Sequence, residues 1–384
     1  MATDTSAVTA QRQQQTADPH KAIRFQPGRG LLGLLGMLIV AWFLANLFLA
    51  FGYYPQWFGN KIVIAIVALI AGVGGAALLF WFLNMFVESL PQRFSLAVIP
   101  YAFLLPAFGL VSLVLLYPTI QTINYSFANS DSTAYVGLQN YGAIFQDSEF
   151  WASWVNNVLW LLIVPAFTVG LGIVVAVLAD KLSATGERGT KGLIFLPMAI
   201  SFVSATAVWG LIYAYNNPGQ AQTGLLNAIV VGLGGQPQTW LAIETAKLNS
   251  LLLMVILIWM QAGFSMVLLS SAIKGVPEDT LEAARIDGAT EFQIFRLVVI
   301  PQISTTIITV YVTIFIIVLK VFDIVYVSTN GSYDTNVIAN LFFNRLFAAS
   351  EAGQAAAIVV TLLIAVTPLI IFQIKTFRDA EAGR

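Results

Sequence analysis

The chain has 384 residues, of which 58% are hydrophobic and only 10% are charged, and its mean hydropathy is +0.82. Soluble domains carry roughly 25% charged residues, so this composition excludes a soluble globule and indicates an integral membrane protein. The net charge of −1 argues against nucleic-acid binding, and the absence of cysteine excludes disulfides, thiol catalysis and thiolate metal sites. The single histidine, His20, lies in a polar N-terminal stretch, so most histidine chemistry is excluded as well.

Hydropathy predicts an all-α membrane protein. Residues 1–29 are rich in Gln, Thr, Ala and Ser, and we expect a disordered tail there. The next apolar run is too long for the core of a signal peptide and is expected to stay in the membrane. Windows of about 20 apolar residues predict eight transmembrane helices in total. They lie near 31–51, 62–87, 96–118, 156–179, 192–214, 249–272, 298–327 and 354–374.

The positive residues predict the orientation of these spans. With both termini in the cytoplasm, fourteen of the 18 Lys and Arg residues lie inside. Lys61, Lys247 and Arg345 lie outside, and the outer loop 119–155 has no Lys or Arg. Cytoplasmic loops of membrane proteins carry such an excess of basic residues. We therefore expect the segment between the sixth and seventh spans to be cytoplasmic.

That cytoplasmic segment, KGVPEDTLEAARIDGATEFQIF from Lys274 onward, is polar in an otherwise apolar chain. Pro277 suits the first position of a helix, and Gly288 can take a positive φ that ends it. Thr290 and Gln293 have the spacing of a capping box at the start of a second helix. The sequence therefore predicts a rigid helical elbow, which serves either as a surface connector or as a docking element.

Two charged residues fall within the predicted seventh span. Lys320 and Asp323 are three residues apart, which places them on one face of a continuous helix. A structural ion pair near the outer end of the span is the favoured interpretation. Substrate contact and a proton relay are the alternatives, because charges within a membrane are often functional.

The elbow carries a family resemblance. The pattern E-A-A-x-x-x-G runs from Glu282 to Gly288, and Val298, Ile300 and Pro301 follow as V-x-I-P. This resembles the signature of ABC importer permeases, in which the elbow is the coupling helix that sits in a groove of the ATPase subunit. The positions that match one by one are Glu282, Ala283, Ala284, Asp287, Gly288 and Ala289.

The resemblance extends over about residues 98–376, and it is strongest to the larger, maltose-type subunit of carbohydrate importers. LKVFDIVYVSTNGSYDT at 319–335 resembles the α-glucoside subgroup in particular. It implies a six-helix type I permease core at 96–376, including the elbow at 274–297. Two additional helices at 30–95 precede that core, and a cytoplasmic tail at 377–384 follows it. The loop 119–155 is too short for a large outer domain and is expected to form a small cap.

The same resemblance implies candidate substrate residues. Met260, Gln261 and Phe264 match sugar-lining positions of maltose-type permeases, with ordinary helix packing as the alternative. Trp209, Tyr213 and Thr313 are weaker candidates, and an interfacial role is more plausible for Tyr213. In contrast, Ile314, Val318 and Val321 stand where the maltose-type pattern is polar, which argues against a maltose-like pose.

The resemblance also implies partners and a location. They are a second permease chain, an ATPase dimer, an extracytoplasmic sugar-binding protein and membrane lipid, in the bacterial inner membrane. The chain has no G-x-x-x-x-G-K-[ST] phosphate loop, so ATP and Mg are expected on the ATPase, with no cofactor or metal in this chain. The alternatives are an ion-coupled secondary transporter and an ABC permease for a non-sugar solute. A membrane enzyme has little support.

Overall fold

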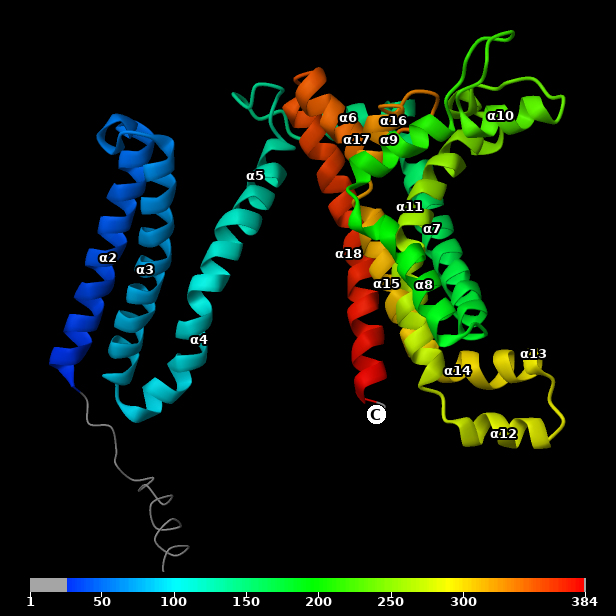
Figure 1. The fold of residues 1–384 in the computed structure, drawn as a ribbon. Helices are drawn as coiled ribbons and strands as arrows, with labels where there is room; N and C mark the ends of the chain where they lie inside the picture. The colour runs from blue at the N-terminus through cyan, green and yellow to red at the C-terminus, as the bar shows by residue number, and fades with distance from the viewer. Residues whose placement is uncertain (1–25, 383–384) are drawn as a thin grey trace, which may run out of the picture. The chain divides into compact units, whose positions relative to one another are not determined.

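The computed structural model describes residues 26–382, and the expected tail at 1–29 lies almost entirely outside these described residues. The chain divides into two compact units, Met1–Thr119 and Ile120–Arg384. Helices dominate the described residues of both units (Figure 1). Extended pairing there is confined to one isolated bridge between Ala128 and Tyr135.

Unit 1 begins with a helical hairpin of α2 (Pro27–Tyr53) and α3 (Lys61–Glu88). The Asn60 side chain caps α3, because its Oδ1 accepts from the backbone N–H groups of Ile62 at 2.7 Å and Val63 at 3.1 Å. The hairpin closes tightly: a Cβ atom on Gly33 would lie 2.7 Å from the backbone nitrogen of Phe86. Small residues allow such close backbone approach between membrane helices. Next come α4 (Gln92–Val111), the π-helical turn η2 (Ser112–Leu116) and α5 (Tyr117–Tyr125), whose last residues lie in unit 2.

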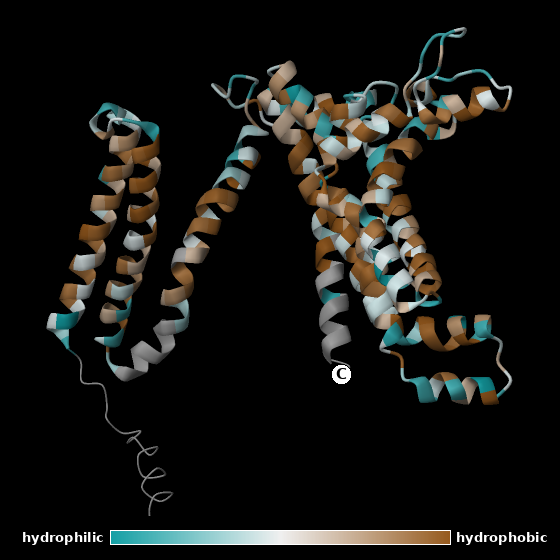
Figure 2. Ribbon diagram, viewed as in Figure 1, coloured by the Kyte–Doolittle hydropathy of each residue, from teal (hydrophilic) through white to brown (hydrophobic). Residues whose placement is uncertain are grey.

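Unit 2 is built around α7 (Ser148–Asp180), α11 (Leu248–Lys274), α15 (Ser304–Leu319) and α18 (Ala352–Ala382). Hydrophobic residues dominate these helices (Figure 2). Its main core joins α7, α11 and α15 through fully buried side chains such as Trp160, Leu253 and Val318. At the crossing of α7 and α11, Gly172 lies against the Ser265 side chain, which holds the two helices close together.

Shorter elements connect these helices. Toward one end of unit 2 lie α6 (Gln139–Gln146), α9 (Phe202–Ile212), α10 (Leu225–Gly232), α16 (Asp323–Ser328) and α17 (Ile338–Phe343) (Figure 1). Short turns are η4 (Trp240–Ala242), η5 (Thr245–Lys247) and η7 (Asn344–Ala348). Toward the other end, near the C terminus of the chain, lie α8 (Ala184–Phe195), α12 (Glu278–Ile286), α13 (Glu291–Ile294) and α14 (Ile300–Gln302) (Figure 1). The turns η1 (Pro55–Phe58), η3 (Leu196–Ala199) and η6 (Phe295–Val299) complete the described elements.

The predicted membrane helices are recovered in position, but their count of eight is not confirmed. Among the described residues, five helices are long and apolar enough to span a membrane, and the number rises to seven if each of two bent pairs is one span. Among the described residues, α18 contributes a shorter apolar helix, Ala352–Pro368, which is not in this count.

The bends explain the other differences from prediction. The chain turns by 106° between Ala184–Ala199 and Phe202–Ile212, within the span predicted at 192–214. It turns by 69° between Glu291–Gln302 and Ser304–Leu319. The span predicted at 298–327 is also interrupted at its far end, because α15 ends at Leu319 and α16 starts separately at Asp323.

Candidate functional site

The predicted elbow is present, and it projects from the end of α11 (Figure 1). A small core of Val276, Ile294, Val299 and Ile303 holds it to the membrane helices. Leu281, Ala284 and Ala289 pack on this core from the inner face of the elbow. The elbow is therefore a folded body and not a loose loop.

The helix ends within the elbow follow the predicted chemistry closely. Gly288 has a φ of +82° just after α12, and Thr290 and Gln293 form the predicted capping box. The Gln293 Oε1 accepts from the Thr290 backbone N–H at 2.8 Å, and the Thr290 Oγ1 accepts from the Gln293 backbone N–H at 3.3 Å. Pro277 differs by one position, because it is the N-cap residue and α12 starts at Glu278. Local sequence therefore determines both helix boundaries.

The six motif residues divide between two faces of the elbow. Glu282, Ala283, Asp287 and Gly288 are exposed, whereas Ala284 and Ala289 face the small core. The exposed face also includes Ile286, which is 86% exposed, so a large apolar side chain there is open to contact. Polar residues cover much of the rest of α12 (Figure 2).

An ion pair joins the two arms of the elbow across the Gly288 turn. The Arg285 Nε lies 2.9 Å from the Glu291 Oε1. Its hydrogen bond to Glu291 raises the pKa of the Arg285 guanidinium above its ordinary value, so the arginine stays charged. Both side chains are exposed, and such pairs add little stability, so the pair orients the arms more than it stabilises them.

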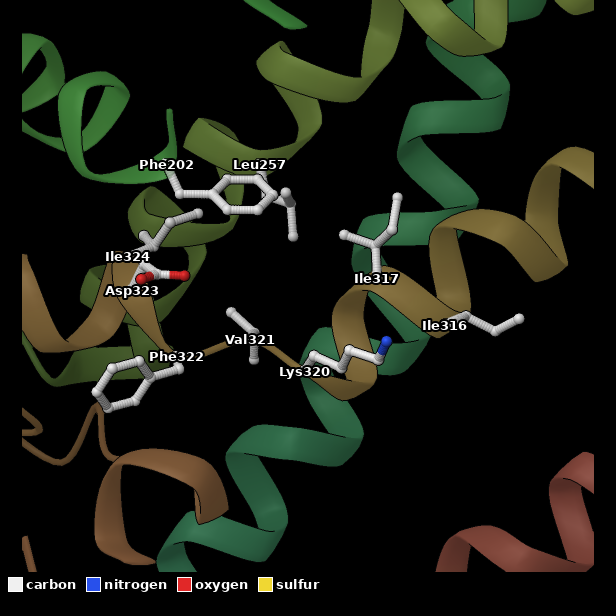
Figure 3. Close-up of a pocket in the computed structure, with 9 residues that line it drawn as sticks. All are labelled: Phe202, Leu257, Ile316, Ile317, Lys320, Val321, Phe322, Asp323 and Ile324. Carbon is white, nitrogen blue, oxygen red and sulfur yellow. The ribbon is translucent and has the colours of Figure 1, made fainter. Parts of the chain in front are cut away.

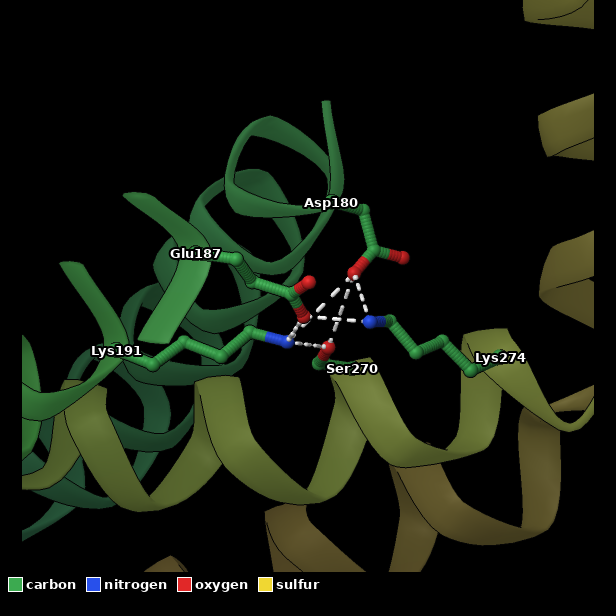
Figure 4. Close-up of polar contacts among 5 residues, drawn as sticks. All are labelled: Asp180, Glu187, Lys191, Ser270 and Lys274. Carbon is green, nitrogen blue, oxygen red and sulfur yellow. Dashed lines mark hydrogen bonds and ion pairs between the residues drawn. The ribbon is translucent and has the colours of Figure 1, made fainter. Parts of the chain in front are cut away.

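A polar cluster that the sequence analysis did not identify lies where α11 ends and the elbow begins (Figure 4). The Lys274 Nζ lies 2.5 Å from the Glu187 Oε1 and 3.3 Å from the Asp180 Oδ1. Lys191 also pairs with Glu187, at 2.5 Å, and donates a hydrogen bond to the Ser270 hydroxyl. The cluster ties the ends of α7, α8 and α11 together. Its sequence signal is the set of charges that flank three apolar spans.

Two cavities lie beside the interruptions of the membrane helices. The first, of about 280 Å³, lies between α9, α11 and the break between α15 and α16 (Figure 3). The second, of about 340 Å³, lies between α11 and the break before α9. The first is lined by Phe202, Leu257, Ile316, Ile317, Lys320, Val321, Phe322, Asp323 and Ile324. The second is lined by Met198, Ile200, Ser201, Phe202, Val203, Met260, Gln261 and Asp323.

The cavities are neighbours, because Phe202 and Asp323 line both of them. A helix break within a membrane leaves backbone N–H and C=O groups without intrahelical partners. Such breaks are tolerated where they are buried in protein or line a water-filled cavity. Two breaks beside adjoining cavities are therefore typical of a solute path, as in the discontinuous helices of transporters.

Two of the six candidate substrate residues line these cavities. Met260 and Gln261 line the second cavity, and both are buried. The Gln261 Oε1 is a buried acceptor that has no hydrogen-bond partner among the described residues. Substrate contact by either residue stays a prediction.

The other four candidates lie outside the two cavities. Phe264 and Trp209 pack against the main core. The Tyr213 hydroxyl donates to the Leu252 carbonyl oxygen at 2.9 Å, and the Thr313 hydroxyl donates to the Thr309 carbonyl oxygen at 2.8 Å. Tyr213 is 5% exposed, so it is a core residue here and not an interfacial anchor.

The expected ion pair between Lys320 and Asp323 does not form in this structure. The expectation assumes a continuous helix, but α15 ends at Leu319 and α16 begins at Asp323. The two residues instead lie on different sides of the first cavity (Figure 3). Both charges therefore lie at the break between the two helices, and neither neutralises the other.

The sequence matches a known protein family and several named proteins. Residues 161–375 match the model of the family described as "Binding-protein-dependent transport system inner membrane component". The chain is 43% identical to the alpha-glucoside transport system permease protein AglF of Rhizobium meliloti over 338 residues, which cover 84% of this chain and 99% of that protein. It is 44% identical over 279 residues to the osmoprotective compounds uptake permease protein GgtC of Synechocystis sp.. This match covers 73% of this chain and 99% of that protein.

Solved structures agree at the level of the fold. A bacterial ABC transporter involved in the import of the acidic polysaccharide alginate contains a chain that matches with a TM-score of 0.65 at 20% identity. The match covers 75% of this chain and 99% of that chain.

Proposed function

Because the chain belongs to the family of binding-protein-dependent transport system inner membrane components, we propose that it is the permease of an ATP-driven importer for a sugar, of the α-glucoside class or a related glycoside. The observation that carries the proposal is the pair of adjoining cavities at the helix breaks, which form the solute path. The chain itself performs no chemical reaction. Relatives named for α-glucosides and for osmoprotective compounds support a small polyhydroxylated solute.

The linings of the cavities suit such a solute. Phe202 lines both cavities with an aromatic ring that suits the C–H face of a sugar, and Gln261 carries an acceptor without a partner for its hydroxyl groups. Leaving a polar group unpaired in a dry site costs on the order of 1–3 kcal/mol, so a path for a polyol needs such acceptors. The maltose-like pose stays unsupported, since Ile314 and Val318 are fully buried in the core.

The elbow is the coupling element in this proposal. The exposed residues Glu282, Ala283, Ile286 and Asp287 dock in a groove of a separate ATPase, which holds ATP and Mg. Closure of the ATPase dimer moves the elbow, and the polar cluster around Glu187 passes that movement to α7, α8 and α11. The cavities then open toward a loaded binding protein. A second permease chain completes the path, and both termini lie in the cytoplasm.

We test coupling with Gly288→Val in the transporter purified with its associated subunits. Valine at a φ of +82° is strained, so the turn between the arms changes shape while the membrane helices keep their packing. We expect sugar uptake into proteoliposomes to fall severalfold while basal ATPase activity persists. A bulky replacement, Glu282→Trp, is expected to act in the same way by blocking the docking face.

The matched control is Asp279→Ala, which removes an exposed acid from the same helix outside the motif. It should leave uptake and ATPase activity unchanged. Normal uptake and normal sugar-stimulated ATPase activity in both Gly288→Val and Glu282→Trp would refute the coupling role.

Two other transport mechanisms are separated by reconstitution. A secondary transporter would take up solute driven by an ion gradient without any ATPase, and the unpaired arrangement of Lys320 and Asp323 gives it no particular support. An ABC permease for a non-sugar solute would show ATP-driven uptake but a flat response across a panel of sugars.

A further inference from the structure

Asp323 lies half-buried at the start of α16 and lines both cavities. Among the described residues, the structure records neither a hydrogen bond nor an ion pair to its side chain. A carboxylate in this position has lost part of its hydration, so it favours a ligand that donates hydrogen bonds. The side chain points toward the first cavity in Figure 3.

Gln261 lines the second cavity together with Asp323, and it carries a second acceptor without a partner. Its side chain is 5% exposed, and its Oε1 has no hydrogen-bond partner among the described residues. Gln261 comes from α11 and Asp323 from α16, so the two acceptors reach the second cavity from different helices. The neighbouring Ser201 cannot serve either of them freely, because its hydroxyl donates to the Ser204 Oγ at 2.9 Å.

Lys320 does not pair with Asp323 or Gln261 in the structure. It lines the first cavity and also a third one of about 380 Å³, whose other wall is formed by α18 residues such as Val359 and Leu362. It is absent from the lining of the second cavity, where Gln261 and Asp323 meet. The side of the path that Gln261 lines is therefore rich in acceptors and carries one negative charge.

We propose that Asp323 and Gln261 form an acceptor pair that binds neighbouring hydroxyl groups of a neutral sugar and discriminates against sugar acids. This inference rests on the proposed function and assigns a substrate contact to Asp323. The carboxylate accepts hydrogen bonds from two hydroxyl groups, while the carboxamide oxygen accepts from a third. A uronate would bring a second negative charge to the same site and is repelled.

The main test compares uptake by the purified transporter with all its subunits, in wild-type and Asp323→Asn forms. The probes are maltose, sucrose and trehalose, each next to a matched disaccharide that carries a glucuronate. Asparagine keeps the shape of aspartate but removes the charge. We expect uptake of the neutral sugar at limiting concentration to fall about tenfold or more, which is the effect of losing one charge-assisted hydrogen bond. We also expect the preference for neutral sugar over uronate to shrink.

The wild-type and Asp323→Asn transporters receive sugar from the same binding protein. The selectivity of the binding protein therefore cancels when the uptake of the two transporters is compared. The matched control is Asp279→Asn, which makes the same change at an exposed acid of α12 that lines neither cavity. It should leave neutral-sugar uptake within about twofold of the wild type. An equal or larger loss in Asp279→Asn than in Asp323→Asn would overturn the assignment.

Gln261→Leu provides a second variant that separates substrate contact from folding. Leucine removes a buried acceptor that has no partner, so we expect the melting temperature to stay the same or rise. Neutral-sugar uptake should nevertheless fall. If Asp323→Asn does not assemble, sugar uptake by Gln261→Leu decides whether the acceptor pair contacts the substrate.

The outcomes also separate this inference from the proposed function. If the wild type takes up none of the sugars, the sugar importer proposal fails. If the wild type takes up sugar and both Asp323→Asn and Gln261→Leu match it, the acceptor pair alone is refuted.

Discussion

Asn156 lies fully buried in the first part of α7, and its side-chain amide donates to the carbonyl oxygens of Asp334 at 2.9 Å and Asn336 at 2.8 Å. It thereby holds a loop in which Tyr333 and Asp334 have positive φ values. A positive φ is costly for residues other than glycine, and it persists here because surrounding contacts hold the backbone. Asn249 donates to the Tyr333 carbonyl oxygen at 2.6 Å, so side chains from both α7 and α11 hold this distant segment.

Asn156→Ala should lower the melting temperature of the protein in detergent, measured by intrinsic fluorescence. The change leaves the buried Asn336 carbonyl oxygen without this donor, at a cost of roughly 1–3 kcal/mol, whereas the Asp334 carbonyl oxygen still accepts from the Lys247 Nζ. Asn46→Ala is the matched control, because the Asn46 amide donates to the Trp42 carbonyl oxygen in an exposed position. Equal melting temperatures for the two variants would contradict the role of Asn156.

Residues differ in how far sequence predicts their role. The roles of Gly288, Thr290 and Gln293 are predictable, because their chemistry depends on neighbours within three positions. The role of Asn156 is not, since its partners lie about 180 residues away along the chain. For Asp323, the sequence wrongly favours a pair with Lys320, because nothing between them signals the end of a helix.

At the scale of elements, α11 and the end of α8 approach closely at Gly263. A Cβ atom there would lie 2.6 Å from the Phe195 Cα, and it would also meet the Ile194 carbonyl oxygen. Both obstacles are backbone atoms, which cannot move aside as a flexible side chain can. This close contact lies a few residues before the break between η3 and α9.

Gly263→Ala should destabilise the protein by about 1–3 kcal/mol, because the extra methyl group forces the two segments apart. Gly170→Ala on α7 is the matched control, since a Cβ atom there meets open space. Thermal unfolding in detergent should show a lower melting temperature for the first variant alone. A stable Gly263→Ala protein would mean that the segments separate without cost.

Hydropathy predicts where the apolar helices lie but not where they break. A sliding window averages over residues and is insensitive to the direction of the backbone. The first break follows Pro197 within a few residues, which is a weak signal, whereas Lys320 to Phe322 contain neither Gly nor Pro. For that reason hydropathy cannot predict the cavities, which the breaks create, although the family resemblance does indicate Met260 and Gln261 as candidates.

At the scale of the whole molecule, the absence of cysteine makes the proposed orientation directly testable. Asp131→Cys and Asp279→Cys each introduce one thiol at an exposed position, the first in the expected outer loop and the second on α12 of the elbow. A membrane-impermeant maleimide should label Asp131→Cys in spheroplasts. It should label Asp279→Cys only in inside-out vesicles or after permeabilisation.

The unmodified chain is the control for labelling, because it has no thiol to react. Labelling of Asp279→Cys in sealed spheroplasts would place the elbow outside and contradict its docking to an ATPase. The fold class can be predicted from the composition of the whole chain, and the family can be predicted from the motif of the elbow. The number of membrane spans could not be predicted in the same way, because bent and short helices leave the count between five and seven among the described residues.

The close packing of the α2–α3 hairpin has a consequence for how the protein is made. The glycines of α2 at its seam meet side chains and backbone from Phe82 to Ser89, all within the first quarter of the chain. This hairpin can therefore insert and close while the ribosome is still translating the rest of the protein. The later helices, with their breaks and unpaired charges, then enter a bilayer in which a finished pair already anchors the nascent chain.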